Sequence, residues 1–161
     1  MPTRTLRPVR KSPPAALQRV PGLSYAALDE FVGFSLRRAQ IASFADFYRG
    51  AAGSGLTPPR FTALLLVGGN PGLRQTLLGE ALGIARSGAM LLTDWLEARG
   101  LVERRASPDD GRAWGLFLTG SGKRVLDAVK RRVGAEDRRR MQRLSLRERR
   151  QLKSLLERIA D

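Results

Sequence analysis

The sequence predicts a mainly α-helical protein with one small two-stranded β-sheet. Apolar residues repeat at helical spacing over residues 74–82 and again over residues 84–99, so two short helices share one core. An alternating run follows, turn-forming residues fill 107–111, and a second apolar run covers 114–118. Helix, turn, helix and hairpin in this order indicate a winged helix-turn-helix domain, which we place at residues 57–118.

The composition favours a polyanionic partner and argues against an enzyme. Lysine and arginine number 29 against 15 acidic residues, a formal net charge of +14, so nucleic acid is the natural partner. Cysteine and histidine are absent, which removes thiol chemistry, histidine acid–base catalysis and the usual zinc ligands. We therefore expect no enzymatic activity, cofactor or metal site. Since no run of about 18 apolar residues and no apolar signal segment is present, we also expect a cytoplasmic protein without a membrane partner.

Residues 1–23 predict a flexible basic arm in front of a single domain at 24–161. The arm has basic residues and no acidic one, and prolines at several positions prevent a continuous helix. Such an arm either lies along DNA phosphates or in a minor groove, or is a solvated tail that raises solubility.

Residues 24–49 are expected to form a helix that is apolar on more than one side. A helix with two apolar sides is buried on both, and in a chain of this size the second side is most simply a partner subunit. Four aromatic side chains in this stretch could instead line a pocket for an aromatic ligand, although the hydrophobic core is the commoner role for each. They are Phe34, Phe44, Phe47 and Tyr48.

The next helix is expected from Thr57, as N-cap before Pro58, through residue 66. The glycine-rich residues 68–72 stop it. They lack the spacing of a phosphate-binding loop, and a connection between two helices explains them.

Two helices after the hairpin complete the predicted fold. Thr119 caps a long helix toward residue 142, whose second face is strongly cationic. Ser145 and Glu148 have the spacing of a capping box, and the helix that follows has an apolar stripe. We expect residues 24–49 and 119–161 to form a dimerisation layer.

The helix at 84–99 is the expected reading helix, since a helix in the major groove reads bases through its exposed N-terminal half. Arg86 can bind guanine or phosphate, and Ser87 can bind either base or phosphate. Met90 and Leu91 can contact only thymine methyl groups, and Trp95 is a further candidate on this face.

Other polar residues are candidates for contacts with the DNA backbone. Arg104 and Arg105 on the first strand are expected to face phosphates, as are Gln75 and Thr76 at the start of the preceding helix. In the hairpin, Asp110 lies two residues before Arg112 and can orient its guanidinium, which suits a narrow A·T minor groove. The alternative for this pair is a surface ion pair that closes the hairpin.

The run LEARGLVERRASPDDGRAWGLFLTGSG resembles the multiple antibiotic resistance regulator (MarR) family of bacterial transcription factors. The acidic-x-Arg motif Asp110-Gly111-Arg112, then Leu118-Thr119 and Gly122, carry the resemblance. It implies dimerisation through terminal helices, Arg112 in the minor groove with Asp110 as its orienting partner, and control by a small ligand. The family usually has polar residues and an arginine where Met90 and Leu91 stand, so this chain departs from the usual base readout.

The function predicted is a homodimeric DNA-binding regulator, a ligand-responsive repressor of a pseudo-palindromic site. Its expected partners are double-stranded DNA, a second copy of the chain and a small aromatic effector. Two alternatives remain at this stage. One is a nucleoid-type protein that binds DNA without sequence preference, and the other is a protein-interaction module that uses Met90, Leu91 and Trp95 as its contact patch.

Overall fold

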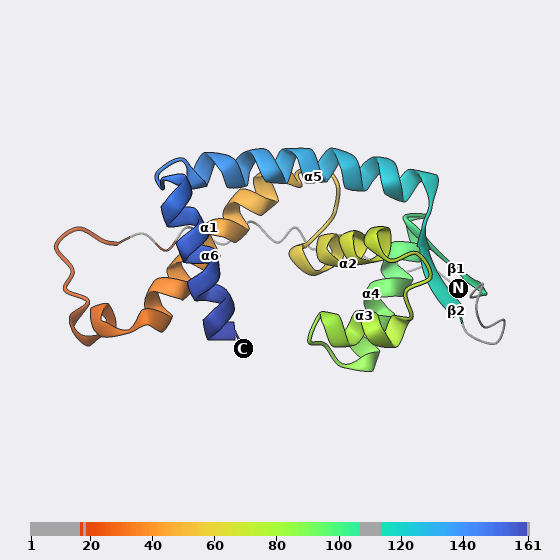
Figure 1. Cartoon of the computed structure of the whole chain (residues 1–161), viewed down its shortest axis with the longest axis horizontal. Helices are drawn as coiled ribbons and strands as arrows, with labels where there is room; N and C mark the ends of the chain where they lie inside the picture. Colours follow the sequence, from red (N-terminus) through yellow and green to blue (C-terminus); the bar gives the residue numbers. More distant parts are fainter. Residues whose placement is uncertain (1–16, 18, 107–113, 161) are drawn as a thin grey trace, which may run out of the picture.

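The computed structural model describes residue 17, residues 19–106 and residues 114–160. One long helix, α5 (Gly120–Met141), runs along the molecule and joins two groups of elements (Figure 1). The winged unit lies under its first half and the terminal helices under its second half (Figure 1). The chain is therefore mainly α with a small β-wing, as the sequence predicts.

The winged unit contains three helices and a two-stranded antiparallel sheet. Its side chains close around one core, in which Leu64, Leu78 and Leu96 are at most 1% exposed. Val102 pairs with Leu118 in the register of the sheet. The elements are α2 (Pro58–Gly69), α3 (Gln75–Ala81), α4 (Arg86–Ala98), β1 (Val102–Ala106) and β2 (Trp114–Leu118).

The loop before α3 pairs with β2 through an isolated antiparallel bridge between Leu73 and Leu116. Leu116 donates its N–H to the carbonyl of Leu73, 3.0 Å away, and accepts from the N–H of Gly72 at 2.9 Å. A Cβ on Gly115 would lie 2.7 Å from the Gly72 backbone, so this pairing requires a glycine there. The glycine-rich connection thus fastens α3 to the wing as well as ending α2.

Local signals account for the helix ends. Thr119 accepts the N–H of Gly122 at 2.9 Å, and the backbone N–H groups of Ser145 and Glu148 are bonded reciprocally as in a capping box. Thr57 occupies the N-cap of α2 with Pro58 at the first helical position, although its hydroxyl makes no capping hydrogen bond. Gly100 has φ +61°, which allows the chain to leave α4 and enter β1.

The terminal helices differ from the prediction in one respect. A single helix over 24–49 is wrong, because Phe31 is extended and separates the 3-10 turn η1 (Ala26–Glu30) from α1 (Val32–Gly50). No residue of α6 (Leu146–Ala160) is buried in one chain, and its apolar side chains stay at least 39% exposed. The dimerisation layer expected from these helices stays a prediction.

Candidate nucleic-acid interface

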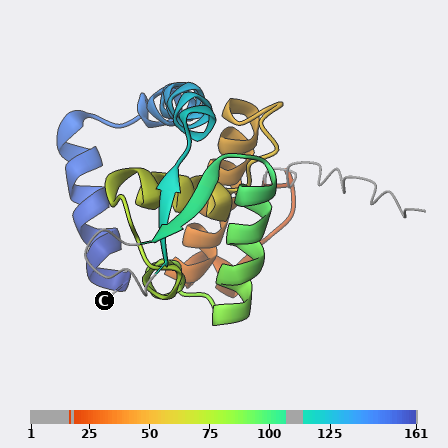
Figure 2. The same ribbon diagram turned by 90° about the vertical axis from the view of Figure 1, so that its right-hand side faces the viewer.

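The exposed face of α4 carries the residues predicted to read DNA. Arg86, Ser87, Met90 and Leu91 are all exposed, and α4 stands beside the sheet with α3 packed against it (Figure 2). A Cβ on Gly79 would come within 3.2 Å of the Ala89 side chain, so a glycine is what lets α3 and α4 approach closely. The packing therefore holds these four side chains outward on a helix fixed from behind.

Trp95 does not belong to that exposed face. Its indole is half-buried against the core and lies between two guanidinium groups, Arg60 at 3.6 Å and Arg99 at 4.2 Å from the ring centroid. The prediction that Trp95 shares an exposed patch with Met90 and Leu91 is therefore wrong. Trp95 faces α2, which carries Arg60. The helical period does not show which other element covers a given face of α4.

Arg104 is held by partners within the chain. Its guanidinium pairs with Asp94 at 2.6 Å and with Glu97, and it donates to the Gln75 side chain at 3.1 Å. The hydrogen bond to Asp94 raises the pKa of Arg104 above its ordinary value. Arg104 and Gln75 thus tie β1 to α3 and α4, and their contacts with phosphates stay a prediction.

Arg105 and Thr76 remain exposed at the surface. Arg105 pairs with Glu103 and lies 4.9 Å from the Phe117 ring centroid, which positions it along the outside of the hairpin. An exposed pair of this kind holds an arginine weakly, and DNA phosphates can replace the carboxylate. The tip of the hairpin, with Asp110 and Arg112, lies outside the described residues.

The four aromatic residues considered for a ligand pocket are not gathered in one place. Phe47 is buried in the core, where its ring lies 5.6 Å from Tyr48 and 5.5 Å from Phe61. Phe44 lines a hollow of about 200 Å³ beside Phe47. Phe34 packs on Tyr25 at 5.8 Å, roughly 15 Å further along α1 at 1.5 Å per residue. Phe44 and Phe47 thus line one hollow in the described part of the chain, and Phe34 lies apart from it.

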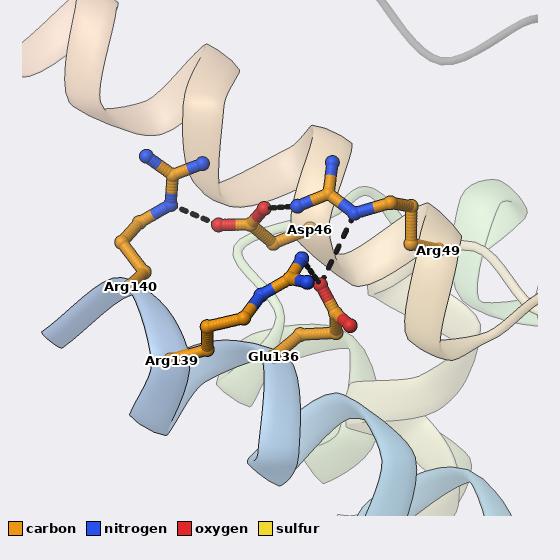
Figure 3. Close-up of polar contacts among 5 residues, drawn as sticks. All are labelled: Asp46, Arg49, Glu136, Arg139 and Arg140. Carbon is orange, nitrogen blue, oxygen red and sulfur yellow. Dashed lines mark hydrogen bonds and ion pairs between the residues drawn. The ribbon is translucent and has the colours of Figure 1, made fainter. Parts of the chain in front are cut away.

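A cluster of ion pairs that the sequence analysis missed fastens α1 to α5 (Figure 3). The buried Asp46 of α1 pairs with Arg49 and Arg140, and Glu136 of α5 pairs with Arg49 at 3.1 Å and Arg139 at 2.5 Å. In the sequence, this cluster is indicated only by Asp46, an acidic residue among the apolar residues in the second half of α1. Its partner Arg140 lies 94 residues away in sequence, so the pairing itself could not be read from the chain.

Two other properties of the described residues bear on function. No three histidine, cysteine, aspartate or glutamate residues among them come together as a metal ion would require. None of the helices in these parts of the chain is both long and apolar enough to cross a bilayer.

Comparison with known proteins gives concordant matches. A family model described as the MarR family matches residues 54–113. A Thauera aromatica protein, whose name assigns it to transcriptional regulation of the hcr operon, is 37% identical over 80% of this chain and 78% of its own. The transcriptional repressor CouR bound to a 23-mer DNA duplex is 38% identical, with a TM-score of 0.80 over 86% of this chain and 99% of that one. CouR bound to p-coumaroyl-CoA is 37% identical, with a TM-score of 0.76 over 86% and 97%.

Proposed function

Because the chain belongs to the MarR family of transcriptional regulators, we propose that it is a homodimeric repressor that binds a pseudo-palindromic DNA site. The observation that carries this proposal is the exposed face of α4, which presents Arg86, Ser87, Met90 and Leu91 from a helix packed on its opposite side. A helix presented in this way enters a major groove, and two copies in a twofold dimer read half-sites about one duplex turn apart.

The dimer is proposed from an uncovered apolar surface between α1 and α6. A groove of about 1090 Å³ lies between these helices, and its lining is mostly apolar. Apolar side chains of α6 stay exposed there in one chain, with Leu152 39% and Leu155 43% exposed. A second copy that inserted its own terminal helices would remove this surface from water, which is the usual source of stability at such an interface.

In the proposed complex each exposed residue has a defined task. Arg86 and Ser87 bind a base edge or a phosphate, and Met90 and Leu91 contact thymine methyl groups. Arg105 and Thr76 contact phosphates beside the groove, while Arg112, oriented by Asp110, enters the minor groove next to it. The basic residues of the arm at 1–23 add phosphate contacts without sequence preference.

The proposed effector is a small aromatic compound or its thioester. CouR, which shares the fold and more than a third of its sequence with this chain, was solved with p-coumaroyl-CoA bound. The hollow beside Phe44 and Phe47 lies where α1 and α5 meet the start of α2, so a ring bound there would touch both the terminal helices and the winged unit. Such a position couples ligand binding to the spacing of the two reading helices.

The proposal is tested by replacing thymine with deoxyuridine in a selected binding site, which removes only the methyl group. We expect the unmodified protein to lose affinity at the thymines that α4 reads, and Met90→Ala with Leu91→Ala to lose that sensitivity. Leu146→Ala, which removes the same atoms from an exposed leucine of α6, serves as the matched control and should keep the sensitivity. Equal affinity of the unmodified protein for the thymine and uracil sites would contradict readout by Met90 and Leu91.

The wing and the arm have separate tests. Arg112→Ala should weaken binding more at A·T-rich than at G·C-rich flanks, because a narrow minor groove concentrates negative potential.

Deleting residues 1–19 should weaken binding to all sequences and flatten the salt dependence by about 0.9 for each phosphate that the arm neutralises. An unchanged salt slope would assign the arm to solubility alone.

A second candidate function is DNA coating without sequence preference, and the net charge of +14 favours it. Genome-wide footprinting distinguishes the two functions. A few palindromic sites support the repressor, whereas uniform protection supports the coating protein.

A further inference from the structure

Arg60 and Arg99, near the loop after α1, differ from the arginines that form ion pairs between elements of the described chain. Arg49, Arg104 and Arg140 each pair with a carboxylate. Arg60 and Arg99 both lie over the Trp95 ring, and neither has a carboxylate within salt-bridge distance among residues 19–106 and 114–160. Two positive charges therefore share one indole without a described counter-ion.

The electrostatic consequence is visible at Arg60. Its burial, and then the charge of Arg99, lower the pKa of Arg60 from its ordinary value. The attraction between each guanidinium and the face of the indole offsets part of this cost. Arg60 also donates to the carbonyl of Gly55 at 3.2 Å, and this hydrogen bond helps to hold it over the indole.

Arg99 also lines a hollow of about 600 Å³ between α5, the end of α4 and the loop after α1. Arg132 of α5 lines the same hollow, where it donates to the carbonyl of Ala52 at 3.3 Å. Leu101, Val125 and Ala128 also line the hollow, and none of its described lining residues is acidic. The hollow thus combines two guanidinium groups with apolar side chains.

We propose that this hollow binds an organic phosphate, with its phosphate held by Arg99 and Arg132 and its apolar part against Leu101, Val125 and Ala128. Guanidinium groups bind phosphate oxygens through charge-assisted hydrogen bonds. Two guanidinium groups balance the two charges of a phosphate ester, whereas a carboxylate ligand would carry only one. The apolar lining residues favour a phosphate ester over inorganic phosphate. The site is separate from the exposed face of α4, so it stands or fails independently of DNA binding.

Trp95 provides the signal for a direct test. The chain has two tryptophans, and Trp114 is exposed on the wing, so Trp114→Phe leaves Trp95 as the single tryptophan, which is excited selectively over the two tyrosines. Phenyl phosphate titrated into this variant, without DNA, should change its fluorescence saturably as Arg99 moves toward the phosphate. Isothermal calorimetry of the same titration measures binding even where the fluorescence stays constant.

The matched variants are two neighbouring arginines of α5. Arg132→Gln should weaken phenyl phosphate binding about tenfold or more, the loss expected for one charge-assisted hydrogen bond. Arg131→Gln removes the same charge from an exposed residue outside the hollow and should leave the affinity within about twofold. Inorganic phosphate should bind more weakly than phenyl phosphate. Absence of calorimetric binding, or equal losses in Arg131→Gln and Arg132→Gln, would overturn the proposal.

Discussion

The winged unit and the terminal helices are built from the same kinds of amphipathic helix, yet only the winged unit is complete within one chain. Leu64 and Leu78 in the winged unit are fully buried, whereas Leu156 and Ile159 on α6 are 40% and 60% exposed. A helix of 15 residues such as α6 is marginal in water without packing on its apolar face. The difference indicates that the terminal helices depend on a surface that a second chain supplies.

Helix α5 contacts both regions, and the kind of residue at its contacts differs between its two halves. Leu126 and Val129, in its first half, are buried against the winged unit. Its second half carries Glu136, Arg139 and Arg140, which contact α1 through ion pairs (Figure 3). Within one chain, the apolar core thus reaches α5 from both the winged unit and the end of α1, where Gly50 packs closely on Val133, and ion pairs add to the junction with α1.

The largest effect is expected in the core of the winged unit. Leu64→Ala should lower the free energy of unfolding by about 2 to 5 kcal/mol, because it leaves a cavity in a fully packed site. Leu91→Ala removes the same atoms from an exposed position on α4 and should change the free energy by less than about 0.5 kcal/mol. Urea denaturation of both variants measures this, and similar losses would contradict the burial difference.

The next effect concerns association of the terminal helices. Leu156→Ala should raise the dimer dissociation constant by about tenfold or more, since a twofold interface loses the side chain twice. Ser154→Ala, on the opposite face of α6, is the control and should leave the constant unchanged. Size-exclusion chromatography over a dilution series compares them. A dimer that is equally stable in both variants would remove α6 from the interface.

A smaller effect separates the two arginines of β1. Arg104→Gln should weaken DNA binding a fewfold at all salt concentrations, because it releases the tie between β1, α3 and α4 while leaving phosphate contacts in place. Arg105→Gln should instead lower the salt slope by about 0.9, the value for one neutralised phosphate. Binding measured at several salt concentrations distinguishes them, and a lower slope for Arg104→Gln would return that residue to a phosphate role.

The smallest effect is expected at the start of α6. Hydrogen bonds from Ser145 lower the pKa of the Glu148 carboxyl, so Ser145→Ala should return that pKa toward its ordinary value. The ionised Glu148 therefore stabilises the fold at any pH above the ordinary pKa of glutamate. This contribution is lost as the pH falls through the lowered pKa of Glu148 in the folded chain. A pH titration of Glu148 followed by NMR measures the change, and an unaltered pKa in Ser145→Ala would contradict the capping role.

Sequence reasoning succeeded where the signal is local. Helical periodicity, the glycine after α4 and the two caps at Thr119 and Ser145 depend on residues within one or two turns, so most element bounds follow from them. It failed at Phe31, where a continuous apolar pattern hides a break between η1 and α1. Apolar periodicity reports which residues prefer burial and carries no information on the backbone angle at one position.

The candidate site was predicted in part for the same reason. The exposed face of α4 follows from its helical period, but the half-burial of Trp95 and the ion pairs of Arg104 do not, because their neighbours come from other elements. Arg104 meets Gln75, which is 29 residues away in sequence. Such contacts depend on the packing of α3, α4 and β1 and not on any one of them.

The most direct test of the central claim is the mass of the unmodified chain in solution. Sedimentation equilibrium at micromolar concentration, without DNA, should give twice the 17.7 kDa of one chain, because the apolar groove between α1 and α6 is covered by a second copy. A particle of 17.7 kDa under these conditions would contradict the claim that the terminal helices are completed by dimerisation.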